Sequence, residues 1–550
     1  MSMLAGATLL AGTLLGAAPA QSAQAQSAQA QSATAASADV PAEFGSDWHD
    51  PVTAAPPVTR PSGKSCQVTL AEAQFRDFTP YTGTYTPPEG CGDRWSKVVL
   101  RMDGKVKGRQ FDRLGYLHLG GVEIFRTSTP QPSPDGIEWS VGKDVTRYSD
   151  TFRARHDVEM LIGNVVDDTY TGIIDVKVTL TFYEGRGAPV PDRVLTLHDN
   201  ALTTPRNSER IVAEVYATGS GGGCEEYWYL TVPSNAPYSC RTDNGPYREV
   251  QIKVDGRLAG IAAPFPTVWT GGWSNPFLWY VVPGPRALDI KPIEYDLTPF
   301  AGLLNDGRAH RVEVTVVGVP EGQPGWSTPV NVLVWQDAKR AQVTGKLTTH
   351  TSGDLADSST YTPGAEHRVD TEGDHRLTVA GYVDTSHGRV TTTVRRSLAN
   401  TSTHRWADGG DPDALKATWT DDESVTVDGF LSGPDHPNPP HVHDGRHDHH
   451  RRGRLARIVL TLGVSRRRHS GPGGPSHGVV PARRHLRGRC HVHDQRPARP
   501  AARGRYDERA LPDPRFGRLL RPVRRHRPGG ADPGTRRLLT GVVCDASQAA

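Results

Sequence analysis

The chain has 550 residues, too many for a single hydrophobic core, so the sequence predicts two or more domains. It contains 58 glycines and 44 prolines but only 4 methionines, a composition that favours turns and short strands over helices. The formal net charge of +3 hides an uneven distribution of basic residues. Beyond the N-terminus no apolar run is long enough to span a bilayer as a helix, which argues against an integral membrane protein.

The first 20 residues resemble an export signal. Residues 3–18 are apolar and are followed by Ala18-Pro19-Ala20, a small-residue cleavage pattern. The basic region of a signal is missing, since no Lys or Arg precedes Arg60; a start codon further upstream or a weak signal would explain this. An Ala-rich disordered leader is the alternative. We expect a signal peptide over residues 1–20 and a disordered Ala/Gln/Ser linker over residues 21–43.

The cysteines agree with export. Four of the six fall in two pairs, and each pair flanks a loop rich in Pro, Gly and Tyr: Cys66 with Cys91, and Cys224 with Cys240. Local disulfides staple such loops in an oxidising compartment. Four unpaired buried thiols are the alternative. The absence of any Cys-x-x-Cys motif argues against a zinc knuckle or a redox site.

Strand patterns follow one another from about residue 44 to residue 337. Ile173–Glu184 alternates apolar with polar side chains, and residues 311–317 do the same. Residues 116–125 predict two short strands around Gly120-Gly121, and residues 250–260 predict two around Asp255-Gly256, a dipeptide suited to a tight hairpin. No segment shows a long helical stripe. The sequence therefore predicts an all-β protein.

A weak internal repeat divides this region. The segment from Lys143 to Thr146 is followed by a strand beginning at His156, and the segment from Tyr295 to Thr298 by a strand beginning at His310. The offset of 152 to 154 residues is a domain length, so we expect two tandem β-sandwiches of similar design; chance similarity is the alternative. The expected divisions are residues 44–190 and 191–338 for the sandwiches, 339–432 for the start of a C-terminal β region, and 433–550 for an aberrant tail.

The tail has an unusual composition. Between His441 and Ala550 there are 25 Arg and no Lys, and half of the 22 His lie there. A nucleic-acid-binding arm or a metal site at the clustered histidines would fit such residues. A third explanation fits better, because a GC-rich gene read out of frame yields Arg, Pro, Gly, Ala and His. Codons that encode residues 441–450 can be chosen so that a one-base shift gives a Thr-rich strand-turn-strand sequence. We expect a frameshift near residues 434–440 and a truncated C-terminal β region.

Carboxylates stand beside aromatic residues at three turns, within residues 111–113, 136–139 and 219–229. Sugar rings lay their apolar faces on aromatic side chains and offer hydroxyl edges to charged partners, so this mixture favours a glycan ligand. On a strand, only one of the adjacent Glu225 and Glu226 would face the site. For each acid alone, a solvated loop carboxylate is the alternative. The part before the tail contains no nucleophile elbow, phosphate loop or dinucleotide fingerprint.

Residues 111–146 strongly resemble the peptide N-glycosidase A family, the glycoamidases of plants, fungi and some bacteria. Residues 225–229, 247–260 and 264–266 resemble the same family, and the similarity runs from about residue 44 to residue 429. The resemblance implies hydrolysis of the amide that joins asparagine to the first N-acetylglucosamine of an N-linked glycan. The products would be aspartate in the peptide and a glycosylamine, which then loses ammonia.

The flavobacterial F-type peptide N-glycosidase is a more distant relative, built of two jelly-roll sandwiches, and the resemblance implies this architecture here. Its catalytic aspartate lies in a Trp-Asp-Arg-Tyr segment that residues 111–113 resemble, which implies Asp112 as the principal catalytic residue. Its substrate-binding glutamate lies in a Cys-Ala-Glu-Trp segment that residues 224–227 resemble. By spacing from Cys224, the resemblance implies Glu226 as a further catalytic candidate, with Glu225 second. Its further glutamate, near the end of the first domain, has no clear match, because residues 161–164, Leu-Ile-Gly-Asn, occupy the corresponding region.

The resemblance leads to a hypothetical mechanism. Asp112 would orient or deprotonate the attacking water, and Arg113 would hold Asp112 ionised or contact the sugar. Glu226 or Glu225 would bind the chitobiose core with Trp228 stacking beneath it. Glu138 is a further candidate for substrate binding. The hypothesis requires no metal and no other cofactor.

We expect a secreted monomer that acts on N-linked glycopeptides or denatured glycoproteins, without nucleic-acid or membrane partners. A carbohydrate-binding sandwich without catalysis is one rival, which would need the aromatic residues but not Asp112. A glycoside hydrolase is another, since two acids also suit that reaction, but it would leave the peptide asparagine unchanged. A frameshifted product that does not fold is a third alternative.

Overall fold

A computed structural model of the chain describes residues 57–130, 132, 135–219, 224–238, 240–243, 245–264, 288–320, 325–408 and 413–429, and the backbone of the strand at 448–464. The expected signal peptide, the expected linker and most of the expected tail lie outside these residues, as do the remaining two of the six cysteines, Cys490 and Cys544. Strands dominate the described part, as the sequence predicts. None of the helices in that part is long and apolar enough to cross a membrane.

The first sandwich consists of two four-stranded antiparallel sheets, ordered β1-β8-β3-β6 and β2-β7-β4-β5. Its strands are β1 (Ser65–Phe75), β2 (Tyr81–Tyr85), β3 (Trp95–Lys107), β4 (Leu114–Leu119), β5 (Val122–Ser128), β6 (Ile137–Asp144), β7 (His156–Ile162) and β8 (Ile173–Glu184). Eight strands in this order form a jelly roll. The alternation predicted for Ile173–Glu184 is confirmed, since every second side chain from Ile174 to Phe182 is at most 1% exposed.

The second sandwich repeats this topology. Its sheets are ordered β15-β11-β18-β9 and β10-β16-β13-β14. Its strands are β9 (Arg193–Thr196), β10 (Ala201–Leu202), β11 (Ser208–Val215), β13 (Glu249–Val254), β14 (Arg257–Ala262), β15 (Ile293–Asp296), β16 (His310–Val317) and β18 (Val330–Gln336). Numbered from one to eight, these strands give the same two sheet orders as the first sandwich, so the chain contains two tandem jelly rolls.

The weak sequence repeat falls on corresponding elements of the two jelly rolls. Its first motif ends the sixth strand in each, β6 and β15, and its second motif begins the seventh, β7 and β16. Short helices connect these strands: η1 (Thr146–Tyr148), η2 (Thr151–Arg153), η4 (Thr298–Phe300) and α3 (Ala301–Leu304). The predicted hairpin at Asp255-Gly256 joins β13 to β14, and both turn residues have positive φ, 47° and 75°. Two such residues are what a tight two-residue hairpin turn requires.

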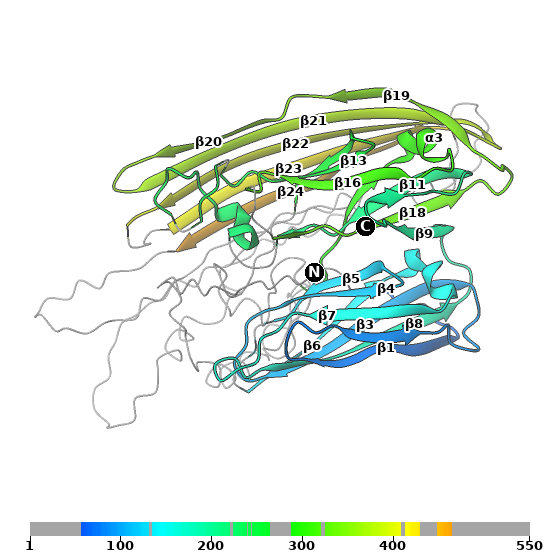
Figure 1. Cartoon of the computed structure of the whole chain (residues 1–550), viewed down its shortest axis with the longest axis horizontal. Helices are drawn as coiled ribbons and strands as arrows, with labels where there is room; N and C mark the ends of the chain where they lie inside the picture. The colour runs from blue at the N-terminus through cyan, green and yellow to red at the C-terminus, as the bar shows by residue number, and fades with distance from the viewer. Residues whose placement is uncertain are drawn as a thin grey trace, which may run out of the picture.

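A third sheet of long strands lies over the second jelly roll (Figure 1). Its order is β19-β21-β22-β23-β24, with β20 also paired to β21. The strands are β19 (Thr344–Ser352), β20 (Ala356–Thr362), β21 (His367–Thr385), β22 (Gly388–Trp406), β23 (Asp413–Asp428) and β24 (Asp448–Val464). Apolar side chains of its inner face, such as Leu377 and Val394, join the core of the second jelly roll. The sheet therefore shares a core with the sandwich that it covers.

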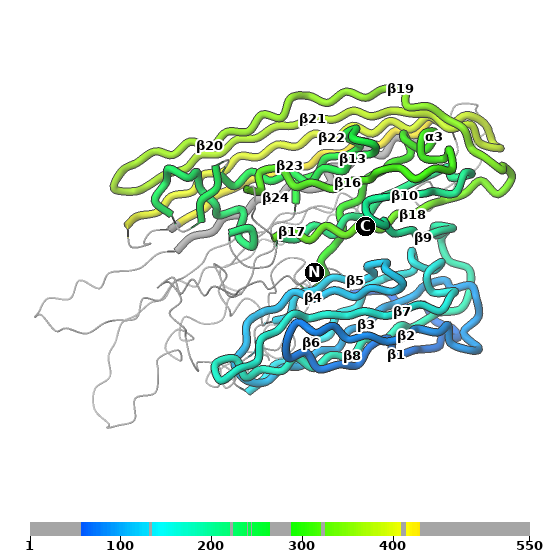
Figure 2. Tube along the Cα trace, viewed as in Figure 1, coloured from blue at the N-terminus to red at the C-terminus, as the bar shows by residue number. Residues whose placement is uncertain are grey.

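In Figure 2 the Cα trace passes from the first jelly roll in blue and cyan to the second in green, and then into the long sheet. Strand β24 follows the expected frameshift position and pairs with β23 along its length. The frameshift itself stays a prediction. Both predicted disulfides are present: Cys66–Cys91, with Cα atoms 5.6 Å apart, and Cys224–Cys240, with Cα atoms 5.2 Å apart.

Candidate active site

Two loops from different jelly rolls bring candidate acids together. Asp112 and Arg113 lie in the loop between β3 and β4. Glu226 lies in the 3-10 helix η3 (Cys224–Leu230), within the connection between β11 and β13. Each loop joins the third to the fourth long strand of its own jelly roll. The charges of Asp112 and Arg113 both act on the Glu226 carboxyl, so the site is composite and needs both sandwiches.

The pKa of Glu226 is shifted far from the ordinary value of a glutamate. Burial raises the pKa of its carboxyl to about 7, and the negative charge of Asp112 adds to the shift. The positive charge of Arg113 and a hydrogen bond with Tyr227 oppose it. Near neutral pH, Glu226 is therefore poised to hold or release a proton beside a second carboxylate. Such a pair can divide acid and base roles.

Arg113 is held next to Asp112 by a chain of hydrogen bonds. Its guanidinium donates to Oε1 of Gln110, with Nε at 3.1 Å. Gln110 is buried and donates in turn to the carbonyl oxygens of Val165 and Gly172, at 2.9 Å each. Burial lowers the pKa of Arg113 while the surrounding negative charges oppose the shift, and an arginine side chain stays protonated in proteins. The result is a fixed positive charge that acts on both acids.

Glu225 serves a different purpose from its neighbour. Its fully buried carboxylate accepts two hydrogen bonds from Arg248, at 2.9 and 2.6 Å, and one from Nε1 of Trp326, at 2.7 Å. The segment is a 3-10 helix with a kink at Tyr227, where we expected a strand. The expectation that only one of the two acids faces the site agrees with these environments. The catalytic assignment stays a prediction for both, and the structure favours Glu226.

The other expected binding residues lie less favourably. Trp228 is only 2% exposed, because its ring packs against Tyr229, Trp326 and Trp419, with centroids 5.5 to 6.3 Å away. A covered ring offers no face to a sugar, so the stacking role predicted for Trp228 is not supported by this arrangement. Glu138 is exposed on β6, opposite Lys105 of β3. It belongs to the sheet that does not carry β4, and its role in substrate binding stays a prediction.

Comparisons with known proteins decide the family. Residues 51–353 match the family model described as peptide N-acetyl-beta-D-glucosaminyl asparaginase amidase A. The chain belongs to this family. A curated relative from Prunus dulcis, peptide-N4-(N-acetyl-beta-glucosaminyl)asparagine amidase A, is 30% identical over 381 residues. That alignment spans 61% of this chain and 66% of the relative's length.

Solved structures show a more distant similarity. One structure of PNGF-II has a TM-score of 0.36 and 14% identity, covering 50% of this chain and 66% of that chain. A second crystal form has a TM-score of 0.32 and 13% identity, covering 48% and 59%. The amidase A family assignment therefore rests on the sequence matches.

Further aromatic side chains lie near the loop that carries Asp112 in this amidase A family member. Phe111 contacts the ring of Tyr170, with centroids 5.3 Å apart. Phe78 is 67% exposed and is one of two exposed large apolar residues in the described part, the other being Val165. Gln110 binds the Val165 carbonyl, and Asn164 binds that of Asp77, so these loops adjoin the one that carries Asp112. No motif marks Phe78 or Tyr170 in the sequence.

One group of the described residues has metal-ligand geometry. Potential ligand atoms of Glu209, Asp337 and His387 lie within 4.8 Å of one another. His387 bonds to Glu209 at 2.9 Å, and Asp337 accepts hydrogen bonds from Ser386 and Lys339. Protein partners thus occupy this group, and it lies on other elements than the two loops of the candidate site.

Glu225→Gln is expected to destabilise the protein by about 3 kcal/mol. Removing one partner of a buried ion pair leaves the other charge uncompensated, here that of Arg248, which is 1% exposed. Urea unfolding monitored by circular dichroism would measure the loss. Glu72→Gln is a matched control, because Glu72 forms an exposed pair with Lys177 and its loss should cost less than about 1 kcal/mol. Equal effects of the two substitutions would contradict the structural role of Glu225.

Proposed function

We propose that this chain hydrolyses the amide bond between asparagine and the first N-acetylglucosamine of N-linked glycopeptides. Membership of the amidase A family supports the reaction class. The observation that carries the proposal is the composite cluster of Asp112, Arg113 and Glu226, in which the pKa of Glu226 is raised to about 7. An amide needs both an activated water and a protonated leaving nitrogen, and this pair of carboxyl groups can supply both.

In the proposed mechanism Asp112 accepts a proton from water as the water oxygen bonds to the asparagine amide carbon. Arg113 keeps Asp112 ionised and ready to accept that proton. The bond between carbon and nitrogen then breaks, and Glu226 donates its proton to the departing nitrogen. The products are an aspartate and a glycosylamine, and the proton exchange with solvent restores both carboxyl groups.

The substrate would lie across the end of the first jelly roll. The exposed ring of Phe78 and the Phe111–Tyr170 pair can contact the apolar faces of sugars. Such contacts would replace the stacking expected of Trp228. We further propose that the protein is secreted, which its two disulfides support, and that it acts as a monomer on glycopeptides or denatured glycoproteins, without nucleic-acid or membrane partners.

The decisive experiment is hydrolysis of a defined N-glycopeptide in water enriched in ¹⁸O, followed by mass spectrometry of the peptide. We expect aspartate carrying one heavy oxygen at the former glycosylation site. Asparagine that is bare or keeps a sugar stub would instead identify a glycoside hydrolase. Binding of the glycopeptide without product would identify a carbohydrate-binding sandwich.

A further inference from the structure

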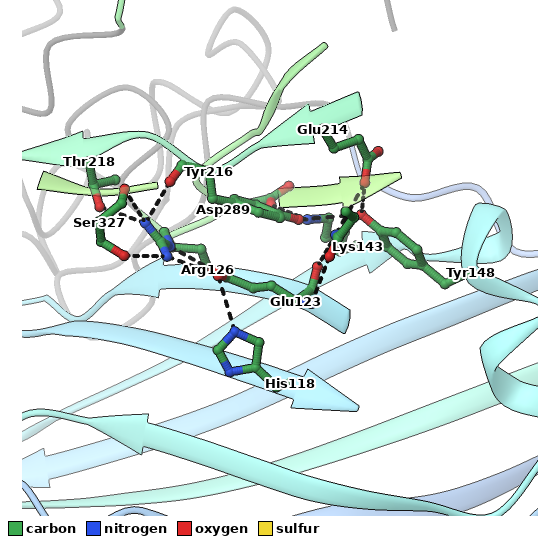
Figure 3. Close-up of polar contacts among 11 residues, drawn as sticks. His118, Glu123, Arg126, Lys143, Tyr148, Glu214, Tyr216, Thr218, Asp289 and Ser327 are labelled. Atoms are coloured by element: carbon green, nitrogen blue, oxygen red, sulfur yellow. Dashed lines mark hydrogen bonds and ion pairs between the residues drawn. The ribbon is translucent and has the colours of Figure 1, made fainter. Parts of the chain in front are cut away.

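Arg126 of the first jelly roll bonds to residues of the second, including Tyr216, Thr218 and Ser327 (Figure 3). Arg126 lies on β5 and is 2% exposed. Its guanidinium makes a bidentate pair with Glu123 of the same strand, with Nε to Oε1 at 2.6 Å and Nη2 to Oε2 at 2.9 Å. This pair neutralises and orients the guanidinium within the first jelly roll.

The remaining donors of Arg126 all reach the second jelly roll. Nη1 donates to the carbonyl oxygen of Tyr216 at 3.0 Å and to Oγ1 of Thr218 at 2.7 Å, and Nη2 donates to Oγ of Ser327 at 3.0 Å. A guanidinium has five N–H groups in a rigid planar fork. All five are therefore engaged, two within one sandwich and three across the boundary. Because the donors lie in one rigid plane, these bonds fix the relative orientation of the two jelly rolls at this point as well as their separation.

On the side of the first jelly roll, Arg126 is connected to the loop that carries Asp112. Three residues after Arg126, Thr129 bonds twice to the backbone of Arg113. The Arg113 N–H donates to Oγ1 of Thr129 at 2.9 Å, and the Thr129 N–H donates to the Arg113 carbonyl at 2.8 Å. Movement of β5 would therefore move Arg113 and its neighbour Asp112.

On the side of the second jelly roll, two of the three acceptors of Arg126, Thr218 and Ser327, belong to a two-stranded sheet formed by β12 (Thr218–Gly219) and β17 (Trp326–Ser327). Trp326 of this sheet donates to Glu225 at 2.7 Å. A side chain at Gly219 would collide with the carbonyl oxygen of Glu225, so β12 lies directly against η3. The β12–β17 sheet, which accepts hydrogen bonds from Arg126, therefore packs against the helix that carries Glu226.

We infer that Arg126 is a positioning residue that fixes Asp112 and Glu226 relative to each other by bonding both halves of the composite site. Other contacts also cross the boundary, including those of Asn331 with the Glu123 backbone and of Lys143 with Tyr216. These contacts hold the sandwiches together without touching the β12–β17 sheet. Among the residues named here, Arg126 is the one of the first jelly roll that bonds to the β12–β17 sheet. The catalytic part of this inference rests on the proposed function, whereas the geometric part does not.

Arg126→Lys tests the inference, because lysine keeps the charge but has three donors on a flexible stem. We expect kcat on an N-glycopeptide to fall about 100-fold with a smaller change in KM, as small displacements of catalytic groups cost rates of this order. The pH profile should change as well. Glu226 is faced by Asp112, Arg113 and Tyr227, and displacement of the loop that carries Asp112 and Arg113 would weaken the opposing effects of both charges together. Burial is the largest cause of the raised pKa of Glu226, so added solvent would lower that pKa. The alkaline limb of the rate profile would then move to lower pH.

A control and a second site variant separate positioning from stability. Arg396→Lys weakens another buried bidentate pair, that with Asp421 of β23 at 2.6 and 2.8 Å. Arg396 also contacts the Glu294 carbonyl and the Tyr295 ring of β15, so its replacement should leave the pH profile unchanged. Thr218→Val removes only one acceptor of Arg126 and should shift the profile in the same direction as Arg126→Lys. Thr218→Val also tests the inference if Arg126→Lys fails to fold. An unchanged pH profile in both site variants would overturn the inference, even if their stability were reduced.

A readout without catalysis keeps the inference separate from the proposed function. Glutamate labelled with ¹³C at the carboxyl carbon would report the titration of Glu226 by NMR, with the signal assigned by its loss in Glu226→Gln. We expect a lower pKa for Glu226 in Arg126→Lys than in the unaltered protein. The same pKa in both would overturn the positioning role. Absence of amidase activity in the unaltered protein would count only against the proposed function.

Discussion

Asp112→Asn is expected to lower kcat/KM for glycopeptide hydrolysis by about 1,000-fold or more. Asparagine keeps the size of the side chain but cannot accept the proton of the attacking water, and general-base catalysis contributes up to about 10⁴-fold. Initial rates of aspartate formation, measured by mass spectrometry, would give the loss. The circular dichroism spectrum should be unchanged, because the substitution conserves shape.

The same substitution has a second expected consequence. The charge of Asp112 raises the pKa of Glu226, so its removal should lower that pKa. Asp157→Asn is a suitable control, because Asp157 is an exposed carboxylate on β7 of the same jelly roll. Retention of more than about a tenth of the rate by Asp112→Asn would remove Asp112 from the role of base.

Glu226→Gln is expected to reduce kcat by about 100- to 1,000-fold and to change the pH dependence. The pKa of Glu226 is about 7, above the ordinary value of 4.5, so the carboxyl is protonated below pH 7 and ionised above it. If Glu226 donates the proton to the leaving nitrogen, the activity of the unaltered protein should decline as the pH rises through 7. Glutamine has no proton to lose in this range, so the residual activity of Glu226→Gln should lack that decline. Rates measured from pH 5 to 9 would show the difference.

Glu313→Gln provides the comparison for Glu226→Gln. Glu313 lies on β16 of the second jelly roll and pairs with Arg311 on the surface, so its loss should leave both the rate and the pH profile unchanged. An alkaline decline that persisted in Glu226→Gln would assign the ionisation to another group. Tyr227 and Tyr229 are poor candidates for it, since burial raises the pKa of both above the ordinary tyrosine value.

Local patterns in the sequence predicted those strands and turns whose conformation depends on neighbouring residues in the chain. The alternation of Ile173–Glu184 identifies β8 because a strand buried on one face repeats every two residues. Asp255-Gly256 identifies the β13–β14 turn because few residues adopt positive φ. Asp112 and Glu226, implied by family resemblance, come together in the structure. The resemblance could name them because they lie in recognisable segments.

The environments of the neighbouring residues could not be predicted in this way. Glu225 and Glu226 are adjacent, and the difference between them depends on Arg248 and on Trp326, which is 101 residues from Glu225. Trp228 looks like a sugar platform in the sequence, but Trp419 of the third sheet covers its ring. Arg126 lies within the stretch that resembles the family, but its role depends on acceptors that a different jelly roll supplies. Partners far apart in the chain decide each of these cases.

The packing of Trp419 on Trp228 determines which part of this protein must be kept together when it is shortened or joined to another protein. The family match ends at residue 353, yet β23 beyond it covers the helix that carries Glu226, and Asp421 of the same strand accepts a hydrogen bond from Ala263. The part of the chain that matches the family model is therefore shorter than the part that packs around the candidate site. Swapping or trimming at the end of the match would cut through a shared core and uncover an indole ring. Boundaries for chimeras and shortened variants of this chain should follow the packing and include β23.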